Sequence, residues 1–476
     1  MTARALTLHP DRLFASDPTQ RAIARRLYET VRDLPILSPH GHTDPRWFAD
    51  DAAFTDAASL LLVPDHYLFR MLYSQGIPLD ALGIPRRDGS VATRDMRAVW
   101  RLFAANYHLF RGTPSRVWLD HVFHEVFGLR AQLDAGTADA YFEHIGTALA
   151  QPGFRPRALL DRFRIEVIAT TEGATDALAE HAKLRGTPWA RRVITTFRPD
   201  DVVDAEREDF AANLVLLGAQ TGEDTGTWPG YLAALRARRA VFRAHGATAT
   251  DHGHPTARTA NLPTADCVSL FERVRHGGGG AADCELFRAQ MLTEMARMSL
   301  DDGMVMQLHP GSHRNHNVWL FETYGRDKGA DIPQPTRYVD ALKPLLDAFG
   351  NDARLTLILF TLDETAYARE LAPLAGHYPA LRLGPPWWFH DSPEGMLRFR
   401  QQVIETAGFH NTVGFNDDTR AFLSIPARHD LARRMDCRFL ATLVAEHRLD
   451  EDEAVEVAQA LTVDLVRKAY RLERAA

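Results

Sequence analysis

Short apolar runs rich in β-branched residues recur along the chain, and each run ends in polar or charged residues. A longer stretch with helical periodicity follows most of them. Strands buried on both faces of a parallel sheet read as continuous apolar runs, so the pattern predicts strands that alternate with helices. The eight predicted strands cover residues 34–40, 165–172, 192–200, 246–253, 304–311, 355–361, 381–388 and 412–418.

Eight strands that alternate with helices predict an α/β protein with a closed, TIM-like (β/α)8 barrel. Two of the eight runs are weaker evidence for a strand than the others. Residues 246–253 are only moderately apolar, and residues 381–388 contain Pro385 and Pro386, which must sit at or beyond the end of a strand. Without those two strands an open sheet would fit as well.

The gap between the first two predicted strands is far too long for one crossover connection, and several stretches within it have helical periodicity. We therefore predict an inserted helical subdomain that could cover the mouth of the barrel. The expected division is residues 1–45 for an N-terminal helix and the first strand, 46–160 for the insertion, 161–428 for the remainder of the barrel, and 429–476 for C-terminal helices packed on it.

Composition narrows the class of protein. Hydrophobic residues make up 45% of the 476 residues and charged residues 25%, which is typical of a soluble globular protein. The net charge of -7 gives no overall basic field, so we expect no nucleic-acid partner. The N-terminus lacks the apolar core of a signal peptide, and no run is long enough to span a membrane. The 3 scattered cysteines predict neither a disulfide framework nor a Cys-x-x-Cys zinc site, so we expect a cytoplasmic protein.

Polar side chains gather at the ends of the predicted strands, where barrel enzymes place their active sites. His40 and His42 follow the first strand, and alternate residues of an extended segment point the same way, so both imidazoles can reach one cation. The pattern alone is weak, because the chain has 21 histidines and His252 and His254 repeat it. A capped turn, or support of another ligand, is the alternative for such a pair.

An anionic third ligand is expected from the last strand, which a closed barrel brings beside the first. Asp418 ends that strand, and the adjacent Asp417 would point elsewhere. A helix cap or a salt bridge is the alternative for either carboxylate. Two imidazoles, one carboxylate and open positions predict a catalytic site for one divalent ion, Zn²⁺ first and Mn²⁺ as the second choice.

Other polar residues near the strand ends suit a small anionic ligand. Arg198 and Arg314 could each hold a carboxylate through two parallel hydrogen bonds, although an ordinary salt bridge is the alternative. His309 ends the fifth predicted strand, and Trp387 with Trp388 could wall a sugar-sized pocket or belong to an aromatic core. His66 and Tyr67 lie in the predicted insertion, where such residues are usually core or surface.

With these residues identified, the chain resembles the uronate isomerases, a divergent branch of the amidohydrolase superfamily. The resemblance runs through most of the chain and is carried by the order and spacing of several motifs. Two departures stand out: HPGSHRNHN replaces an expected HIGALRNNN-like loop after the fifth strand, and DDTR replaces TDSR after the eighth. Strand four also lacks the lysine that superfamily hydrolases use to bridge two metals, so one metal is expected. The motifs are SPHGHTDP, DHYLFRMLYSQGI, TTEGATDAL, TFRPD, TDHG, MQLHPGSHRNHN, PPWWFHDSPEGM and NDDTRAFLS.

The resemblance implies aldose-to-ketose isomerisation of a hexuronate, D-glucuronate to D-fructuronate or D-galacturonate to D-tagaturonate, through a cis-enediol. It further implies that Asp418 takes part in proton abstraction at C2 and that Tyr67 shuttles a proton between two substrate oxygens. The implied metal ligands are His40, His42 and Asp418; the catalytic group is Asp418, Tyr67, His66 and Arg420; and the substrate-binding group is Arg198, His309, Arg314, Trp387 and Trp388.

Two rival functions stay open at the level of sequence. A mononuclear metal-dependent hydrolase on the same barrel would use the same three ligands to activate water. A catalytically silent sugar-acid binding protein would keep the pocket without turnover. Under each of the three readings the partner is a small molecule, and a homo-oligomer is possible.

Overall fold

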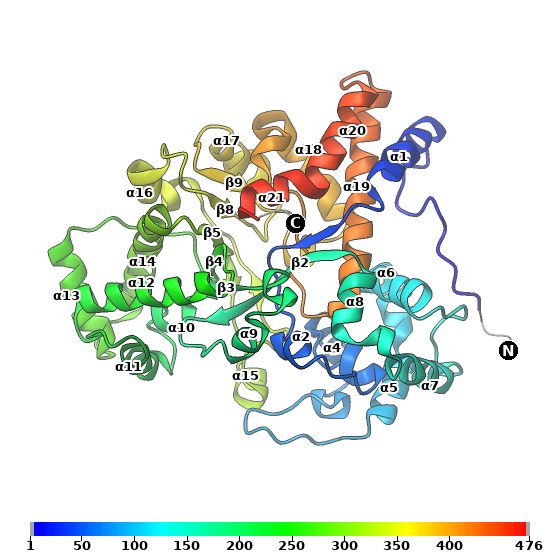
Figure 1. Cartoon of the computed structure of the whole chain (residues 1–476), viewed down its shortest axis with the longest axis horizontal. Helices are drawn as coiled ribbons and strands as arrows, with labels where there is room; N and C mark the ends of the chain where they lie inside the picture. Colours follow the sequence, from blue (N-terminus) through cyan, green and yellow to red (C-terminus); the bar gives the residue numbers. More distant parts are fainter. Residues whose placement is uncertain (1–3, 473–476) are drawn as a thin grey trace.

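The computed structural model describes residues 4–472, and its centre is a parallel sheet whose strands follow the order β1-β2-β3-β4-β5-β8-β9 (Figure 1). All of the pairings in this sheet are parallel, as the alternation of strands and helices predicts. Both of the weaker sequence runs form strands. The strands are β1 (Ile36–Ser38), β2 (Ile165–Gly173), β3 (Val193–Arg198), β4 (Ala249–His252), β5 (Val305–Leu308), β8 (Leu357–Leu359) and β9 (Leu381–Leu383).

The eighth predicted strand is the exception, because residues 412–418 form a bridge to β9 and then an irregular segment. The amide of Val413 donates to the Leu383 carbonyl at 3.1 Å, and the amide of His42 donates to the Thr419 carbonyl at 3.0 Å. These bonds join the β9 side of the sheet to the β1 side, which gives a TIM-like barrel.

Gly414 explains why this segment is not a regular strand. Its φ is +75°, outside the range of extended L-residues, and the Leu461 carbonyl oxygen lies 2.4 Å from the position that a Cβ would occupy. The C-terminal region therefore packs so closely on the segment that only glycine fits.

Between β1 and β2 the chain is helical and packs around its own apolar cluster, which includes Trp100, Phe103 and Tyr141. These helices lie together on one side of the sheet in Figure 1. Within this region α3 and α4 stand on either side of Pro64. The α-helices are α2 (Pro45–Asp50), α3 (Ala57–Leu61), α4 (His66–Ser74), α5 (Met96–Ala105), α6 (Pro114–His121), α7 (Ala138–Leu149) and α8 (Pro156–Arg162).

Helices that follow the later strands cover the outside of the sheet, and the largest apolar cluster lies between the two layers. A two-stranded antiparallel hairpin, β6 (Ser312–His313) with β7 (Ile332–Pro333), holds the loop after β5. The helices are α9 (Ala179–Leu184), α10 (Asp200–Val203), α11 (Phe210–Thr221), α12 (Trp228–Ala244), α13 (Thr264–Arg275), α14 (Ala281–Asp302), α15 (Val318–Tyr324), α16 (Val339–Phe349), α17 (Ala372–Ala375) and α18 (Pro393–Ala407).

The two ends of the chain pack on the barrel. Helix α1 (Pro18–Val31) shares an apolar cluster with α19 (Ile425–Ala445) and α20 (Glu451–Gln459). The last helix, α21 (Leu465–Tyr470), lies over the N-terminal ends of the strands, where its side chains join those that fill the barrel (Figure 1). No helix within residues 4–472 combines the length and the apolar character needed to cross a membrane.

Candidate functional site

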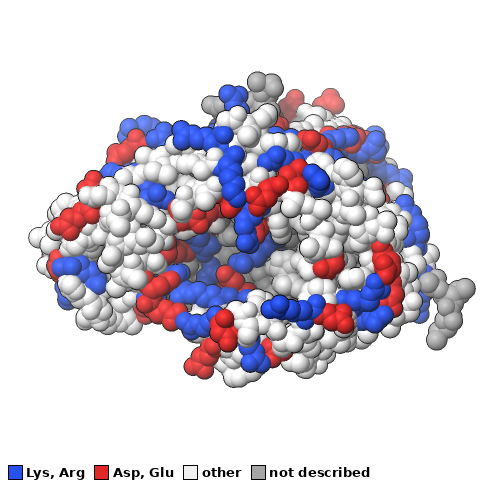
Figure 2. Space-filling model, turned by 60° about the horizontal axis from the view of Figure 1, so that its bottom comes forward, with Lys and Arg blue, Asp and Glu red and all other residues white. Residues whose placement is uncertain are grey.

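The carboxyl ends of the strands open into one cavity of about 850 Å³, bounded also by α4 and the β6–β7 hairpin. Figure 2 shows the molecule hollowed near the middle of the face turned forward, with basic and acidic side chains around the hollow. The structure brings all of the residues predicted as metal ligands, catalytic groups or substrate-binding groups to this cavity. They are His40, His42, His66, Tyr67, Arg198, His309, Arg314, Trp387, Trp388, Asp418 and Arg420.

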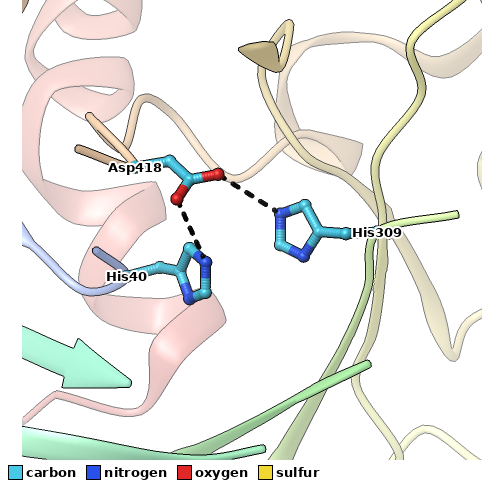
Figure 3. A group of neighbouring side chains, drawn as sticks. All are labelled: His40, His309 and Asp418. Carbon is cyan, nitrogen blue, oxygen red and sulfur yellow. Dashed lines mark ion pairs between the residues drawn. The ribbon is translucent and has the colours of Figure 1, made fainter. Parts of the chain in front are cut away.

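Asp418 stands at the centre of the histidines. Its Oδ1 lies 3.4 Å from His40 Nε2 and 3.2 Å from His42 Nε2, and its Oδ2 lies 4.0 Å from His309 Nε2. Figure 3 shows His40 and His309 directed at the two carboxylate oxygens. Asp418 has a φ of +38°, in the left-handed region that few residues other than glycine adopt.

His309 belongs to the cluster of candidate metal-ligating side chains, although the sequence assigned it to substrate binding. The ligand atoms of His40, His309 and Asp418 all lie within 4.8 Å of one another, whereas His42 is near Asp418 but is not part of that mutual set. Nδ1 of His309 is paired with Asp251 Oδ1 at 2.6 Å, and its buried Nε2 has no hydrogen-bond partner among the described residues. An imidazole oriented by a carboxylate, with the other nitrogen left free, is the usual arrangement of a metal ligand.

The electrostatics of the group favour a cation. Burial would raise the pKa of Asp418, but His40 and His42 outweigh it and hold that pKa well below its usual value, so the carboxylate is charged. Burial lowers the pKa of both His42 and His309, which favours the neutral form that ligates metals. The pKa of His40 is raised, because Asp418 and Asp251 outweigh the effect of burial. Positive charge is therefore favoured between His40 and Asp418, and the donor set fits a divalent ion.

The competing carboxylate, Asp417, faces away from the cavity. Its Oδ2 lies 3.0 Å from Nε2 of His429 on α19, and the side chain is buried there. The two neighbouring aspartates thus point to different partners.

A further group, made of Asp200, His252 and His254, has ligand atoms within 4.8 Å of one another, but Asp200 is already paired with Arg198 at 2.8 Å.

Each predicted arginine is anchored by an acidic partner at the cavity wall. Arg198 contacts Asp251 at 3.2 Å in addition to Asp200, and its burial would lower its pKa, but these carboxylates raise that pKa instead. Arg314 pairs with Asp331 at 2.9 Å, and Arg420 pairs with Asp327 at 3.1 Å. The acidic partners hold the three guanidinium groups in place at the cavity wall. The acidic partners of the three arginines are Asp200, Asp251, Asp327 and Asp331.

Helix α4 carries His66 and Tyr67 into the cavity. Its N-cap, Asp65, accepts a hydrogen bond from the Tyr67 amide at 2.9 Å and so fixes the first turn of the helix. His66 Nε2 accepts from the Trp388 indole N–H at 3.2 Å. Burial, reinforced by Arg420, lowers the pKa of His66 to about 3, so this imidazole is neutral and its proton is on Nδ1.

Tyr67 is held between aromatic rings and a buried arginine. Its ring stacks on His66, with centroids 4.9 Å apart, and meets Trp118 edge-on at 5.8 Å. Arg428 lies 5.6 Å from the Tyr67 ring and bonds Asp391 at 2.5 Å. Burial, followed by the charge of Asp391, raises the pKa of Tyr67 well above its ordinary value, so the phenol keeps its proton.

The two tryptophans differ in their roles. Trp387 lies edge-on to His309, with centroids 4.7 Å apart, and helps to fix that ring. Trp388 begins a 3-10 turn, Trp388–His390, with a φ of +56°, which is rare for a bulky residue and is found where a functional site imposes it.

Sequence reasoning missed several residues that orient the site. Asp251 lies at a predicted strand end and Asp391 lies within the PPWWFHDSPEGM motif, so both could have been chosen on those grounds. Asp327 and Arg428 lie in segments without strand or motif signals that mark them. Their importance depends on contacts with residues far away in the sequence: Asp327 with Arg420, and Arg428 with Asp391 and Tyr67.

The whole chain is similar to known proteins in both sequence and fold. A family model described as glucuronate isomerase matches residues 16–468. Proteins named uronate isomerase from Rhizorhabdus wittichii and Xanthomonas axonopodis pv. citri are each 67% identical over 472 residues, which covers 99% of this chain and 100% of each relative. A crystal structure of glucuronate isomerase from Caulobacter crescentus has a TM-score of 0.98 at 61% identity, covering 99% of this chain and 98% of that one. A uronate isomerase structure from Thermotoga maritima has a TM-score of 0.90 at 25% identity, covering 98% and 99%.

Proposed function

Because this chain belongs to the glucuronate isomerase family and interconverts the aldose and ketose forms of a uronate, we propose a division of tasks among the residues that line its cavity. The reaction moves a proton from C2 to C1 and exchanges the oxidation states of these carbons. It needs a base near C2, a group that donates a proton to O1 and accepts one from O2, and a cationic site for the C6 carboxylate. The convergence of a His and Asp group and three arginines on one cavity is the observation that carries the assignment.

We propose that His40, His42 and Asp418 hold one divalent ion, with His309 as a further candidate ligand. When bound, the ion would supply Lewis-acid polarisation of substrate oxygens and make a substrate hydroxyl more acidic. Imidazole and carboxylate donors suit Zn²⁺ best and Mn²⁺ next. The free Nε2 of His309 and the charged carboxylate of Asp418 support this donor set.

Asp418 is the proposed base for the proton at C2. The neighbouring histidines keep its pKa low, so it is ionised at neutral pH and can accept a proton. Tyr67, which keeps its phenolic proton, is the proposed shuttle between O1 and O2. His66 is neutral, and because its Nε2 accepts from Trp388, its Nδ1–H is free to donate to the sugar.

Arg198, Arg314 and Arg420 are the proposed binding site for the substrate carboxylate and for its polar oxygens. Guanidinium groups bind carboxylates through paired hydrogen bonds, and acidic partners already fix these three in place. Three guanidinium groups at one cavity suit a small anionic substrate, whereas the net charge of -7 gives no overall basic field for a nucleic acid. A homo-oligomeric state and a cytoplasmic location stay predictions.

The decisive experiment is a two-substrate assay of the metal-analysed protein. NMR should show the keto-acid forming from D-glucuronate, from D-galacturonate or from both, and substrate deuterated at C2 should lose label to solvent or show a primary isotope effect. Turnover of lactones or amides without turnover of uronates would favour the hydrolase instead. Binding of uronates without any turnover would favour the silent binding protein.

Two neighbouring carboxylates provide a matched pair of variants for the same assay. Asp418→Asn should reduce kcat by orders of magnitude, because one proposed metal ligand and the base are lost together. Asp417→Asn, which alters the aspartate that faces His429, should keep bound metal and most of the activity. The reverse outcome would move the proposed ligand from position 418 to position 417.

A further inference from the structure

A hydrogen-bonded chain leads from the C-terminal helix to the proposed metal ligand His40, through the interior of the barrel. The Tyr470 hydroxyl on α21 donates to Gln307 Oε1 at 2.9 Å and accepts from Asn416 Nδ2 at 2.9 Å. Gln307 Nε2 lies 3.3 Å from His40 Nδ1 and 3.4 Å from the Thr250 carbonyl. Gln307 and Tyr470 are fully buried, and Asn416 and His40 are nearly so.

We propose that Gln307, Tyr470 and Asn416 are positioning residues that orient His40 for metal binding from the end of the barrel opposite to the cavity. The proposal rests on the proposed role of His40 as a ligand. None of the three lines the cavity, so they would act through His40 and not through the substrate.

The chemistry of imidazole explains why His40 needs such partners. Nε2 of His40 faces Asp418, so Nε2 is the nitrogen that must offer its lone pair to a cation. A neutral ring then carries its proton on Nδ1, and a buried N–H without an acceptor is costly. Gln307 is the neighbour that can meet Nδ1, because a side-chain amide offers a donor on one side and an acceptor on the other.

These hydrogen-bonded residues can serve both protonation patterns of His40 if the side-chain amides of Gln307 and Asn416 turn over and so exchange nitrogen and oxygen. In the first pattern the Gln307 N–H points to His40 Nδ1, and the Tyr470 hydroxyl donates to Gln307 and accepts from Asn416. With the amides turned, the Gln307 carbonyl accepts from Nδ1–H, its N–H donates to Tyr470, and the phenol donates to Asn416. Turning the amide gives up the 3.4 Å bond to the Thr250 carbonyl and gains a bond to the ligand. The second pattern is the one that a metal on Nε2 requires.

The position of Tyr470 is fixed by packing on the apolar side chains that fill the barrel. Val466 and Ala469 of α21 belong to one buried cluster with Leu37 and Val305, from β1 and β5. Burial raises the pKa of Tyr470 above the ordinary phenol value, so the hydroxyl always has one proton to donate. Docking of the C-terminal helix is thereby linked to the orientation of His40.

The test is the affinity for Zn²⁺, measured by competition with a chromophoric chelator on the full-length protein. Tyr470→Phe keeps the ring and removes the hydroxyl, and Gln307→Met keeps the length and removes the amide. Each should weaken Zn²⁺ binding by roughly 10- to 100-fold, the usual effect of removing a partner of a metal-binding histidine. The cobalt-loaded variants should also show an altered visible absorption band, because the His40 ring is less well fixed.

Tyr231→Phe is the matched control. Tyr231 is as buried as Tyr470, and its hydroxyl donates to the Val202 carbonyl at 2.8 Å, away from His40. This control should lose a similar amount of thermal stability and bind Zn²⁺ like the unmodified protein. Zn²⁺ affinity within twofold of the unmodified protein in Tyr470→Phe would overturn the proposal.

Two further variants separate the possible failures. If Tyr470→Phe does not fold, Gln307→Met decides the question, because it leaves α21 unchanged, and unaltered Zn²⁺ affinity in it would overturn the proposal. His40→Ala tests the premise that His40 is a metal ligand. If this variant binds Zn²⁺ as tightly as the unmodified protein, the proposed metal site is wrong, and so is the proposed positioning of His40 for metal binding.

Discussion

At the scale of single residues, the site depends on acidic side chains that orient other functional groups. Asp251 is the clearest case, because one of its oxygens lies 2.6 Å from His309 Nδ1 and the other lies 3.2 Å from Arg198. Burial would raise the pKa of Asp251, but Arg198 and His309 outweigh burial and hold that pKa well below its usual value. One charged carboxylate therefore fixes both a candidate metal ligand and a candidate substrate-binding group.

Replacing Asp251 by Asn should keep the shape of the side chain and remove its charge. Asn can still accept from His309, but it no longer neutralises Arg198, so we expect kcat/KM for the uronate to fall by about 10- to 100-fold. Steady-state kinetics and metal content of the purified variant test this. Asp436→Asn, which alters a carboxylate paired with Arg400 at 2.6 Å away from the cavity, is the control and should keep normal kinetics. Normal kinetics in Asp251→Asn would show that His309 needs no such partner.

At the scale of elements, α4 is the helix through which the region between β1 and β2 contributes side chains to the cavity of the barrel. This helix has nine residues, and its first two, His66 and Tyr67, face the cavity. Its orientation depends on the Asp65 cap and on packing of Leu68, Phe69 and Leu72 in the core of that helical region. A short helix has little stability of its own, so the cap and the packing decide where its first turn lies.

Removing the cap by Asp65→Ala should therefore affect both stability and catalysis. Loss of an N-cap costs about 1 kcal/mol of the free energy of unfolding, and here the freed turn also carries two proposed functional groups. Asp17→Ala removes the equivalent cap from α1, where Asp17 accepts from the Gln20 amide at 2.8 Å far from the cavity. Chemical denaturation should show similar losses for the two variants, and only Asp65→Ala should reduce kcat. Equal kcat in both would mean that the first turn of α4 does not need its cap for catalysis.

At the scale of the whole molecule, the proposed metal site joins the beginning of the chain to its end. His40 follows β1, Asp418 lies in the segment after β9, and the bond between His42 and Thr419 closes the ring between them. An ion held by these residues would tie together segments separated by most of the barrel sequence, in addition to its chemical role.

Metal removal should accordingly lower the thermal midpoint as well as abolish isomerisation. A ligand that binds only the folded state, at a free concentration 100 times its dissociation constant, adds about 2.7 kcal/mol to the free energy of unfolding. Differential scanning fluorimetry with and without chelator should show a drop that added Zn²⁺ reverses. His40→Ala should show no response to chelator. An equal response in this variant would place the stabilising ion at another site.

Local sequence patterns are enough to predict which residues stand at the mouth of the barrel. Buried parallel strands are recognisable as apolar runs, and their carboxyl ends meet at one edge, so the residue after each run is placed without knowledge of distant contacts. The predicted positions of His40, Arg198 and His309 follow from this regularity, and so does the helical character of the region that carries Tyr67.

The directions and pairings of the side chains, in contrast, depend on contacts that form only in the folded molecule. Asp418, next to Asp417, has a φ of +38°, and a φ of +75° at Gly414 interrupts the eighth predicted strand where the Leu461 carbonyl packs against it. The partnership of Arg420 with Asp327 and the reach of Tyr470 to the interior depend on segments far apart in the chain. Local patterns of hydrophobicity report which face of an element is buried, and they carry no information about which distant polar atom completes a hydrogen bond.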